Sequence, residues 1–368
     1  MHVMILGTRG IPACHGGFET FAQDLSLFLA ARNHHVTVYC QAGPDTALAE
    51  DVWNGVHRVL VPSPDSSIGT MLFDWAATMH SSRREGIALT LGYNTGVFNF
   101  MFRLRHIPNI MNMDGIEWKR AKWSWPQRGW LWFNEWAGAR CADHLIADHP
   151  EIAVHLRRHT SSDKISMIPY GADAITSAST EPLTRYGLKS KGYYFLVARA
   201  EPENSILEIV SSFSSRRVSF PLVVLGEYSP ERNRFHRRVI DAAGPNVRFA
   251  GAIYDREIVR ALRFHARAYI HGHQVGGTNP SLVESLAAGN AIIAHDNRFN
   301  RWVAGQGAMY FKGSDDLEEI LYSLERDPCV LHGMEESSRQ RHGKEFTKER
   351  VLSAYEELLH RFASGHSQ

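Results

Sequence analysis

Several features that would assign a protein to a class at once are scarce in this chain. It has 368 residues and only four cysteines, which lie far apart and form no CxxC pair. That pattern argues against a zinc site or a disulfide scaffold and fits a reducing compartment. No stretch approaches the apolar length that spans a bilayer, and no basic segment precedes an apolar one at the N-terminus. We therefore expect a cytoplasmic protein.

Excess charge is also missing, because the formal net charge is only +1. Nucleic-acid binding is thus not expected. The motif GxGxxG is absent, so the dinucleotide-binding fingerprint is not met. The whole chain is 44% hydrophobic and 21% charged, which is typical of a folded soluble protein. Its length predicts two domains.

Short apolar runs alternate with amphipathic stretches such as 18–31 and 71–82. This alternation predicts parallel βαβ units, hence an α/β fold. The pattern restarts after a weakly structured segment at 173–183. The predicted strands are 3–7, 36–40, 56–61, 87–91, 107–111 and 144–147, followed by 194–197, 222–225, 247–249, 268–271 and 291–294.

These runs predict two Rossmann-like halves with parallel sheets, which we place at residues 1–172 and 173–345. The remaining residues, 346–368, contain a charged amphipathic helix at 347–363. One face of that helix carries Val351, Tyr355, Leu358 and Leu359.

The most informative segment is 271–297, HGHQVGGTNPSLVESLAAGNAIIAHDN. It predicts a strand end, a glycine loop, a short helix that stops at Gly289, and a second buried strand. Gly276 and Gly277 let the backbone approach a ligand closely, because they carry no Cβ. His273 follows the first of these strands and is expected to line a ligand pocket rather than to form a metal pair with His271.

Two N-caps are possible for the helix in this segment. Asn279 can cap it, with Pro280 at the first helical position. Alternatively Ser281 caps it, and Glu284 three residues later completes a capping box. In either case free N–H groups and the positive dipole end face the glycine loop, which suits a phosphate. The simpler alternative is an ordinary βαβ corner.

Two further loops follow predicted strands. Gly7 and Gly10 bracket the first turn, and Gly16 and Gly17 precede the next helix, which indicates a loop folded over a bound group or a turn that needs glycine for packing. In the second half Arg199 follows strand 194–197. It can reach a phosphate bidentately. Alternatively it forms a surface ion pair with Glu201 or Glu203.

Residues 114–136 hold six of the nine tryptophans, interleaved with Lys119, Arg120, Lys122 and Arg128. This mixture suits an anionic membrane–water interface or the stacking of acceptor sugars. The alternative is that several of these rings fill the core. Asp114 follows a strand and is the best candidate for a polar group near an acceptor hydroxyl. Otherwise it caps the next helix or pairs with Lys119.

Taken in order, six segments resemble the retaining GT-B glycosyltransferases of family four, and within it a bacterial rhamnosyltransferase-like branch. They are GTRGIPACHGGFET (7–20), NMDGIEWKRAKW (112–123), ADHLIADHPEI (142–152), IPYGAD (168–173), ARAEPEN (198–204) and GGTNPSLVESLAAGNAIIAHDN (276–297).

This resemblance implies two facing Rossmann-like domains, the acceptor on the first and the sugar nucleotide on the second, with the terminal helix packing back across them. Arg199 would hold the diphosphate and Glu284 the ribose, with Asp114 as the third catalytic candidate. The expected donor-binding residues are Gly16, Gly17, Asn204, His273, Gly277, Thr278, Asn279 and Ser281. The acceptor or membrane residues are Trp118, Lys119, Trp123, Trp125 and Arg128.

Three positions depart from the family pattern. Gly276 stands where the first glutamate of E-x7-E belongs, and Asn204 replaces a lysine that often follows the arginine. Asp114 stands in place of a common histidine. These changes fit a 6-deoxy sugar, whose pocket can dispense with one polar partner.

We therefore expect a hexosyltransferase without metal or cofactor that moves rhamnose, another deoxyhexose or a hexose from a dTDP-, UDP- or GDP-linked donor. The expected acceptor is a saccharide, carried on a polyprenyl diphosphate, in surface polysaccharide biosynthesis at the inner face of the plasma membrane. The alternatives are a GT-B sugar-nucleotide epimerase and a non-catalytic protein that binds nucleotide sugars.

Overall fold

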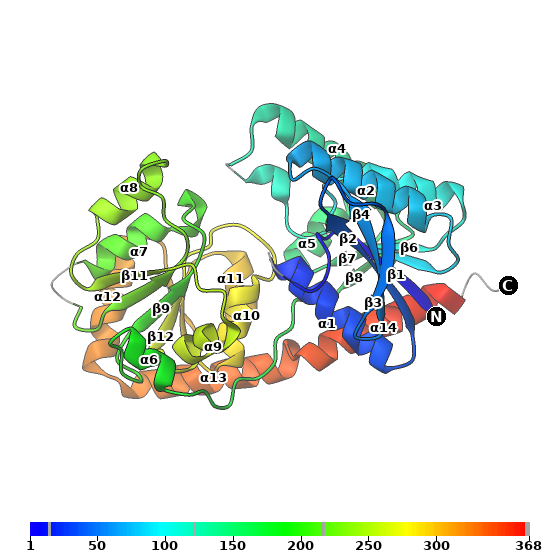
Figure 1. Cartoon of the computed structure of the whole chain (residues 1–368). Coiled ribbons are helices and arrows are strands. Elements are labelled where there is room, and N and C mark those ends of the chain that lie inside the picture. Colours follow the sequence, from blue (N-terminus) through cyan, green and yellow to red (C-terminus); the bar gives the residue numbers. More distant parts are fainter. Residues whose placement is uncertain (14–15, 121, 215–217, 365–368) are drawn as a thin grey trace. The chain divides into compact units, whose positions relative to one another are not determined.

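The computed structural model describes residues 1–13, 16–120, 122–214 and 218–364 (Figure 1). The chain divides into two compact units. The first comprises Met1–Pro169 together with Val351–Gln368, and the second comprises Tyr170–Arg350. Each unit holds one sheet with helices on its faces (Figure 1).

The sheet of the first unit has the strand order β3-β4-β2-β1-β5-β6-β7-β8. Its neighbouring strands are parallel, except that β3 is antiparallel to β4. The strands are β1 (His2–Leu6), β2 (His35–Ala42), β3 (Ala49–Trp53), β4 (Val56–Pro62), β5 (Ile87–Leu91), β6 (Asn109–Asn112), β7 (His144–Ala147) and β8 (Ile165–Met167).

The burial of each strand explains whether the sequence pattern predicts it. Every residue of β5 and β7 is buried, so they read as continuous apolar runs, as strands covered on both faces do. The edge strand β3 is largely exposed and polar, so it leaves no such run. The predicted strand 107–111 begins two residues late, at Asn109, because Pro108 has no N–H to donate to a ladder.

The helices of the first unit follow its strands. They are α1 (Gly17–Ala31), α2 (Ser67–Ser81), α3 (Phe100–Leu104), α4 (Trp125–Cys141) and α5 (Pro150–Leu156), with short 3-10 turns η1 (Gly96–Asn99), η2 (Glu117–Lys119) and η3 (Ser162–Lys164). Helix α2 begins four residues earlier than the pattern predicts, because the Ser66 side chain accepts from the N–H of Gly69 at 3.0 Å and caps it.

The second unit has an all-parallel sheet in the order β11-β10-β9-β12-β13-β14. Its strands are β9 (Tyr194–Val197), β10 (Leu222–Leu225), β11 (Val247–Gly251), β12 (Ala268–His271), β13 (Ala291–His295) and β14 (Met309–Phe311). Its helices are α6 (Glu181–Arg185), η4 (Pro202–Asn204), α7 (Ile206–Phe213), α8 (Arg234–Asp241), α9 (Arg256–Phe264), α10 (Pro280–Ala287), α11 (Arg298–Ala304), α12 (Ser314–Arg326) and α13 (Cys329–Glu345).

Alternate residues of β12 pack into different cores. Ala268 and Ile270 join the core beneath α7 and α12, whereas Tyr269 joins the core beneath α9, α10 and α11. Because side chains of a strand alternate between faces, helices on both faces are needed to bury such a strand. Both faces of the central strands β9 and β12 are therefore covered, and the loops that follow their carboxyl ends form one edge of the sheet.

The terminal helix α14 (Lys348–Ser364) packs on the first unit from Val351 onwards. The predicted apolar face is buried, with Val351, Tyr355, Leu358 and Leu359 each at most 3% exposed. The Asn112 amide at the end of β6 donates to the Tyr355 hydroxyl at 2.6 Å. No helix among the described residues is long and apolar enough to cross a bilayer.

Candidate functional site

Arg199 lies two residues beyond β9, at the carboxyl edge of the second sheet. It is exposed, and no described residue forms an ion pair with it, so the alternative pairing with Glu201 or Glu203 is not realised. Its backbone carbonyl accepts hydrogen bonds from the N–H of Glu201 at 2.8 Å and from the Asn204 amide at 2.9 Å. The loop is thus fixed while the guanidinium remains available.

Asn204 itself faces inward. It is 4% exposed, and its side-chain amide donates the hydrogen bond that the Arg199 carbonyl accepts. The neighbouring Ser205 has φ 50 and donates its hydroxyl to the carbonyl of Gly272 at 2.8 Å. The Gln274 N–H donates to the Glu203 carbonyl at 2.9 Å. These bonds join the loops that follow β9 and β12 into one rigid edge.

The loop after β12 is also tied to α11. Asn297 and Asn300 donate their amides to the His273 carbonyl at 2.9 and 2.8 Å. The rings of His271 and His273 are stacked, 4.4 Å apart and 9° from parallel. Burial lowers the pKa of His271 well below its usual value, with the nearby histidines adding to the effect, so its ring is neutral. A neutral, fully buried ring serves packing beneath the loop.

The helix α10 begins with the first of the two predicted caps. Asn279 is the N-cap, and its side chain accepts from the N–H of Ser281 at 3.0 Å, with Pro280 at the first position. The alternative capping box of Ser281 and Glu284 is wrong, because the Ser281 hydroxyl instead contacts the Tyr269 hydroxyl at 2.6 Å. Tyr269 also donates to the Val197 carbonyl at 3.4 Å, so the end of β9 and the first turn of α10 are held together.

Thr278 is buried, and Gly277 is half-buried in the loop ahead of this helix start. Gly276 has φ 138, which an L side chain rarely adopts, although a Cβ there would meet no atom within 4 Å. A glutamate at this position would be strained by the backbone rather than by its neighbours. The backbone conformation of the loop therefore disfavours a carboxylate side chain at position 276.

Glu284 lies one turn inside α10 and pairs with a residue that no sequence motif indicates. Its Oε2 lies 2.7 Å from Nη2 of Arg263, which comes from α9. The Arg263 side chain is 6% exposed, and that of Glu284 is 35% exposed. The pair orients the carboxylate from beneath, and only the buried end of the pair is removed from water.

On the first unit, Asp114 follows β6 and has φ 51. Its N–H donates to the Asn112 side chain at 2.9 Å. It neither caps η2, whose N-cap is Ile116, nor forms an ion pair with Lys119. Burial raises the pKa of its carboxyl, and the negative charge of Glu117 raises it further. A raised pKa suits a group that holds a proton.

Two tryptophans of the 114–136 segment bond inward. The Trp118 indole donates to Glu135 at 2.9 Å, and the Trp123 indole donates to Glu117 at 3.2 Å. Lys119 is exposed, with its Nζ 5.4 Å from the centre of the Trp118 ring. Trp125, by contrast, is 85% exposed. Its partner Arg128 lies 5.8 Å from that ring.

Glu135, 1% exposed, belongs to one of two groups of described residues whose ligand atoms could hold a metal ion. Its Oε1 lies 2.7 and 3.0 Å from the Nε2 atoms of His155 and His159. Burial acts to raise the pKa of Glu135, but the hydrogen bonds and charge of the histidines lower it overall. The other group is His34, Glu356 and His360.

The four glycines after β1 separate into two kinds. A Cβ on Gly7 would lie 2.3 Å from the Leu91 carbonyl oxygen, and one on Gly10 would lie 2.6 Å from Cys40, so packing requires both. Gly16 and Gly17 are exposed and form the N-cap and first residue of α1. Cys14 and His15 between these pairs lie outside the described residues.

The comparisons with known proteins agree with this architecture. A family model described as a domain of unknown function, DUF1972, matches residues 1–173. No curated protein matches the sequence. The fold is that of GT-B glycosyltransferases.

Sucrose-phosphate synthase from Thermosynechococcus elongatus is 16% identical, with a TM-score of 0.83 and 99% of each chain covered. HepE from Anabaena in complex with UDP and glucose is 14% identical, with a TM-score of 0.77, covering 98% of this chain and 100% of that one. Trehalose 6-phosphate synthase from Burkholderia multivorans is 11% identical, with a TM-score of 0.73 and 100% and 97% covered.

Proposed function

We propose that this protein is a glycosyltransferase that moves a sugar from a nucleoside diphosphate to a saccharide acceptor. The observation that carries the proposal is the edge of the second sheet. There an exposed arginine that no described residue pairs with lies on the loop after β9, and a helix preceded by two glycines begins after the adjacent strand β12. A free guanidinium and helix N–H groups are the groups that bind a diphosphate.

In this proposal Arg199 and the backbone N–H groups of the loop at 276–279, ahead of Pro280, hold the diphosphate, and Glu284 receives the ribose hydroxyls. These groups also neutralise the leaving diphosphate, so we propose a reaction that needs no metal. Asn204 acts indirectly, because its amide fixes the Arg199 loop. His273, Gly16 and Gly17 are proposed to line the donor.

The direct test is titration calorimetry with UDP, GDP and dTDP. We expect micromolar binding of one of them, and Arg199→Ala should weaken it about 10- to 100-fold, the worth of a charge-assisted bidentate contact. Arg232→Ala is the matched control, because Arg232 belongs to the same unit and its side chain is 86% exposed. Equal affinity of the Arg199 variant and the control variant would refute the proposed site.

We propose a deoxyhexose donor, such as dTDP-rhamnose, because Gly276 offers no carboxylate to a sugar hydroxyl. A pocket built around a hydroxyl rejects an analogue that lacks it, so a pocket without that partner accommodates a 6-deoxy sugar. HepE has been solved with UDP-glucose. Turnover of UDP-glucose faster than that of dTDP-rhamnose would contradict the deoxyhexose assignment.

The acceptor is proposed to be a saccharide on a polyprenyl diphosphate in surface polysaccharide synthesis, with Asp114 near the attacking hydroxyl. The support is the position of Asp114 after a strand of the first sheet, together with the exposed tryptophans of α4, which suit a membrane surface. We also propose retention of the anomeric configuration and a cytoplasmic enzyme in peripheral contact with the membrane. Proton NMR of the product reports the anomer directly.

One assay separates the transferase from the two alternatives. Nucleoside diphosphate is released in the presence of the acceptor by a transferase, whereas an epimerase interconverts donors without an acceptor. A non-catalytic binding protein does neither, although it still binds the nucleotide.

A further inference from the structure

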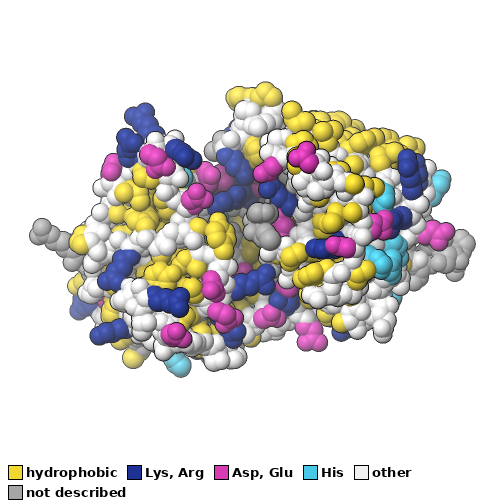
Figure 2. Space-filling model, in the orientation of Figure 1, with side chains coloured by type: hydrophobic (Ala, Val, Ile, Leu, Met, Phe, Trp, Pro, Cys, Tyr) yellow, Lys and Arg dark blue, Asp and Glu magenta, His cyan; other side chains and the backbone are white. Residues whose placement is uncertain are grey.

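The first unit carries a large apolar surface that its own core does not use. It lies on the outer sides of α2, η1, α3 and α4, which we call the apolar face (Figures 1 and 2). More than half of the large hydrophobic side chains exposed in the described chain belong to it. They are Ile68, Leu72 and Trp75 of α2, Phe100 and Leu104 of α3, and Trp125, Trp130, Trp132, Phe133 and Trp136 of α4.

These side chains form a connected surface rather than isolated exposures. Helix α2 packs against η1 and α3, and α4 packs against both as well. The Trp75 ring lies 5.2 Å from that of Phe98 and 6.3 Å from that of Phe100. On α4 the rings of Phe133 and Trp136 are stacked at 6.0 Å. A contiguous apolar patch of this kind marks a binding surface.

The charges of the apolar face have one sign. All residues of these four helices are described, and their only acids, Asp74 and Glu135, turn inward. Asp74 accepts from the Thr95 hydroxyl at 2.8 Å, and Glu135 accepts from Trp118 and His155. The arginines of the same helices are Arg103 of α3 and Arg128 and Arg140 of α4, of which Arg103 and Arg140 are exposed.

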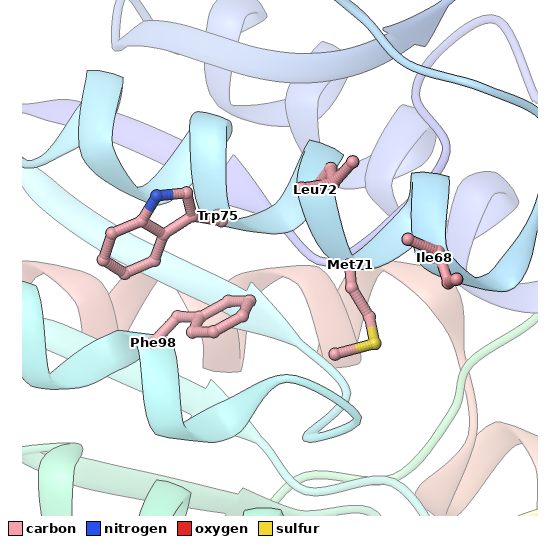
Figure 3. A pocket seen from close by; sticks show the side chains of 5 residues that line it. All are labelled: Ile68, Met71, Leu72, Trp75 and Phe98. Carbon is pink, nitrogen blue, oxygen red and sulfur yellow. The ribbon is translucent and has the colours of Figure 1, made fainter.

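A groove lies within this face, between α2 and η1. Its volume is about 420 Å³, and its lining is Ile68, Met71, Leu72, Trp75 and Phe98 (Figure 3). In the close-up the Trp75 and Phe98 rings lie at one end of the groove, edge to face, while Met71 points toward the η1 side. All five side chains are apolar, so the groove suits a hydrocarbon chain and offers almost nothing to a polar ligand.

We propose that the apolar face docks on a bilayer that contains anionic lipid, and that the groove between α2 and η1 receives one hydrocarbon chain of a membrane lipid. Aromatic rings and arginines are the side chains that settle at a membrane–water interface with anionic headgroups. Arg140 already lies 4.8 Å from the Trp136 ring, which places its charge at the edge of the apolar surface.

A second copy of the chain fits this face less well. A symmetric dimer brings the same patch of each copy together, so two positively charged faces would meet with no exposed acid on these helices to compensate. An anionic bilayer supplies the complementary charge and an apolar interior in one surface. This docking deepens the membrane contact under the proposed function, but it requires no step of sugar transfer.

The test is flotation of the full chain with vesicles of phosphatidylcholine alone and with added phosphatidylglycerol. We expect binding to the anionic vesicles that weakens as salt is raised. The variant Ile68→Ser/Leu72→Ser should lower the partition coefficient about tenfold or more, because two apolar side chains no longer enter the bilayer. These side chains are exposed, so the fold should survive.

The matched control is Leu48→Ser/Val52→Ser, because these two side chains of the same unit are also exposed but lie at β3, outside the apolar face. The control should bind vesicles as the parent does. Binding that is equal in the two variants, or absent with anionic vesicles, would overturn the proposal. So would concentration-dependent dimerisation that the Ile68→Ser/Leu72→Ser variant abolishes, because a second copy would then be the occupant.

A fluorescent label tests the groove itself. In a Cys14→Ser/Cys141→Ser/Cys329→Ser background, which keeps only the buried Cys40, a polarity-sensitive dye at Met71→Cys should shift to the blue with anionic vesicles and be quenched by lipids spin-labelled deep in the acyl chain. The same dye at Leu48→Cys should do neither. A dye at position 71 that stays in a polar environment while the protein floats would refute the groove assignment.

Nucleotide binding distinguishes this inference from the proposed function. Both serine variants should bind nucleoside diphosphate as the parent does, because Arg199 and Glu284 belong to the other unit. A chain that floats with vesicles but binds no nucleotide would refute the proposed function alone. A chain that binds nucleotide but no vesicle would refute the docking alone.

Discussion

Removing Glu284 should destabilise the fold more than removing Arg263, although the two residues form one ion pair. The variant Glu284→Ala leaves the Arg263 guanidinium, whose side chain is 6% exposed, without an anionic partner. Nε of Arg263 already has no hydrogen-bond partner among the described residues. The variant Arg263→Met leaves Glu284 instead, whose side chain is 35% exposed and can turn toward water. The two truncations therefore cost different free energies of unfolding.

Breaking a fully buried pair costs about 3–5 kcal/mol, and breaking an exposed pair costs less than about 1 kcal/mol. We expect about 2–3 kcal/mol for Glu284→Ala, because one end of the pair is buried. For Arg263→Met we expect about 1 kcal/mol, since methionine keeps the apolar stem and the carboxylate stays hydrated. In a unit of this size these values lower Tm by about 5–10 °C and about 3 °C.

The assay is calorimetric melting of the two single variants and the double variant, with the melting of the second unit followed separately. The double variant should resemble Arg263→Met, because it no longer leaves a buried unpaired charge. If Arg263→Met melts as low as Glu284→Ala, the burial argument is wrong. Arg263→Met should also weaken nucleotide binding about tenfold, because the carboxylate that it orients loses its support.

Three further predictions concern other sites. Burial raises the pKa of Asp74 to about 6, against a hydrogen bond from Thr95 that lowers it. A carboxyl whose pKa is raised on folding stabilises the fold at low pH and loses that contribution as pH rises through about 6. Urea unfolding of the parent should thus lose up to about 3 kcal/mol between pH 4 and 7, a loss that Asp74→Asn should abolish. Tyr355→Phe should lower the free energy of unfolding by about 1–3 kcal/mol, because it leaves the buried Asn112 amide without its acceptor, and an unchanged urea midpoint would contradict this. Gly276→Glu should not restore hexose turnover but should lower Tm by a few degrees, because φ 138 strains any side chain, and a gain in UDP-glucose transfer would show that the loop relaxes.

The sequence pattern predicted the strands that are buried on both faces, and also the partly exposed β4 and β11. It missed the edge strands β3, β8 and β14, because β3 is polar and β8 and β14 have only three residues, so none leaves a continuous apolar run. The local features of the donor loop were also predictable, since an asparagine followed by proline favours a helix start. The choice of Asn279 as the N-cap was not, because it depends on Tyr269 occupying the Ser281 hydroxyl.

Arg263 could not have been predicted, because it lies 21 residues before Glu284 and on a different helix. Nothing in the pattern of α9 distinguishes a buried arginine from the exposed ones around it. The tryptophan-rich segment was similarly ambiguous. The sequence grouped Trp118, Trp123 and Trp125 together, but the first two donate to buried acids while the third faces solvent.

By itself the sequence determined the alternation of strands and helices, the glycine turns and the place of Arg199 after a strand, because each depends on residues close together in the chain. Only the tertiary structure decided which charges are paired and which apolar side chains stay exposed. The apolar face is the clearest example, since it joins α2, α3 and α4 across residues 67–141. The sequence shows the tryptophans of α4, but only the packing of the helices places their apolar sides together with the acids turned inward.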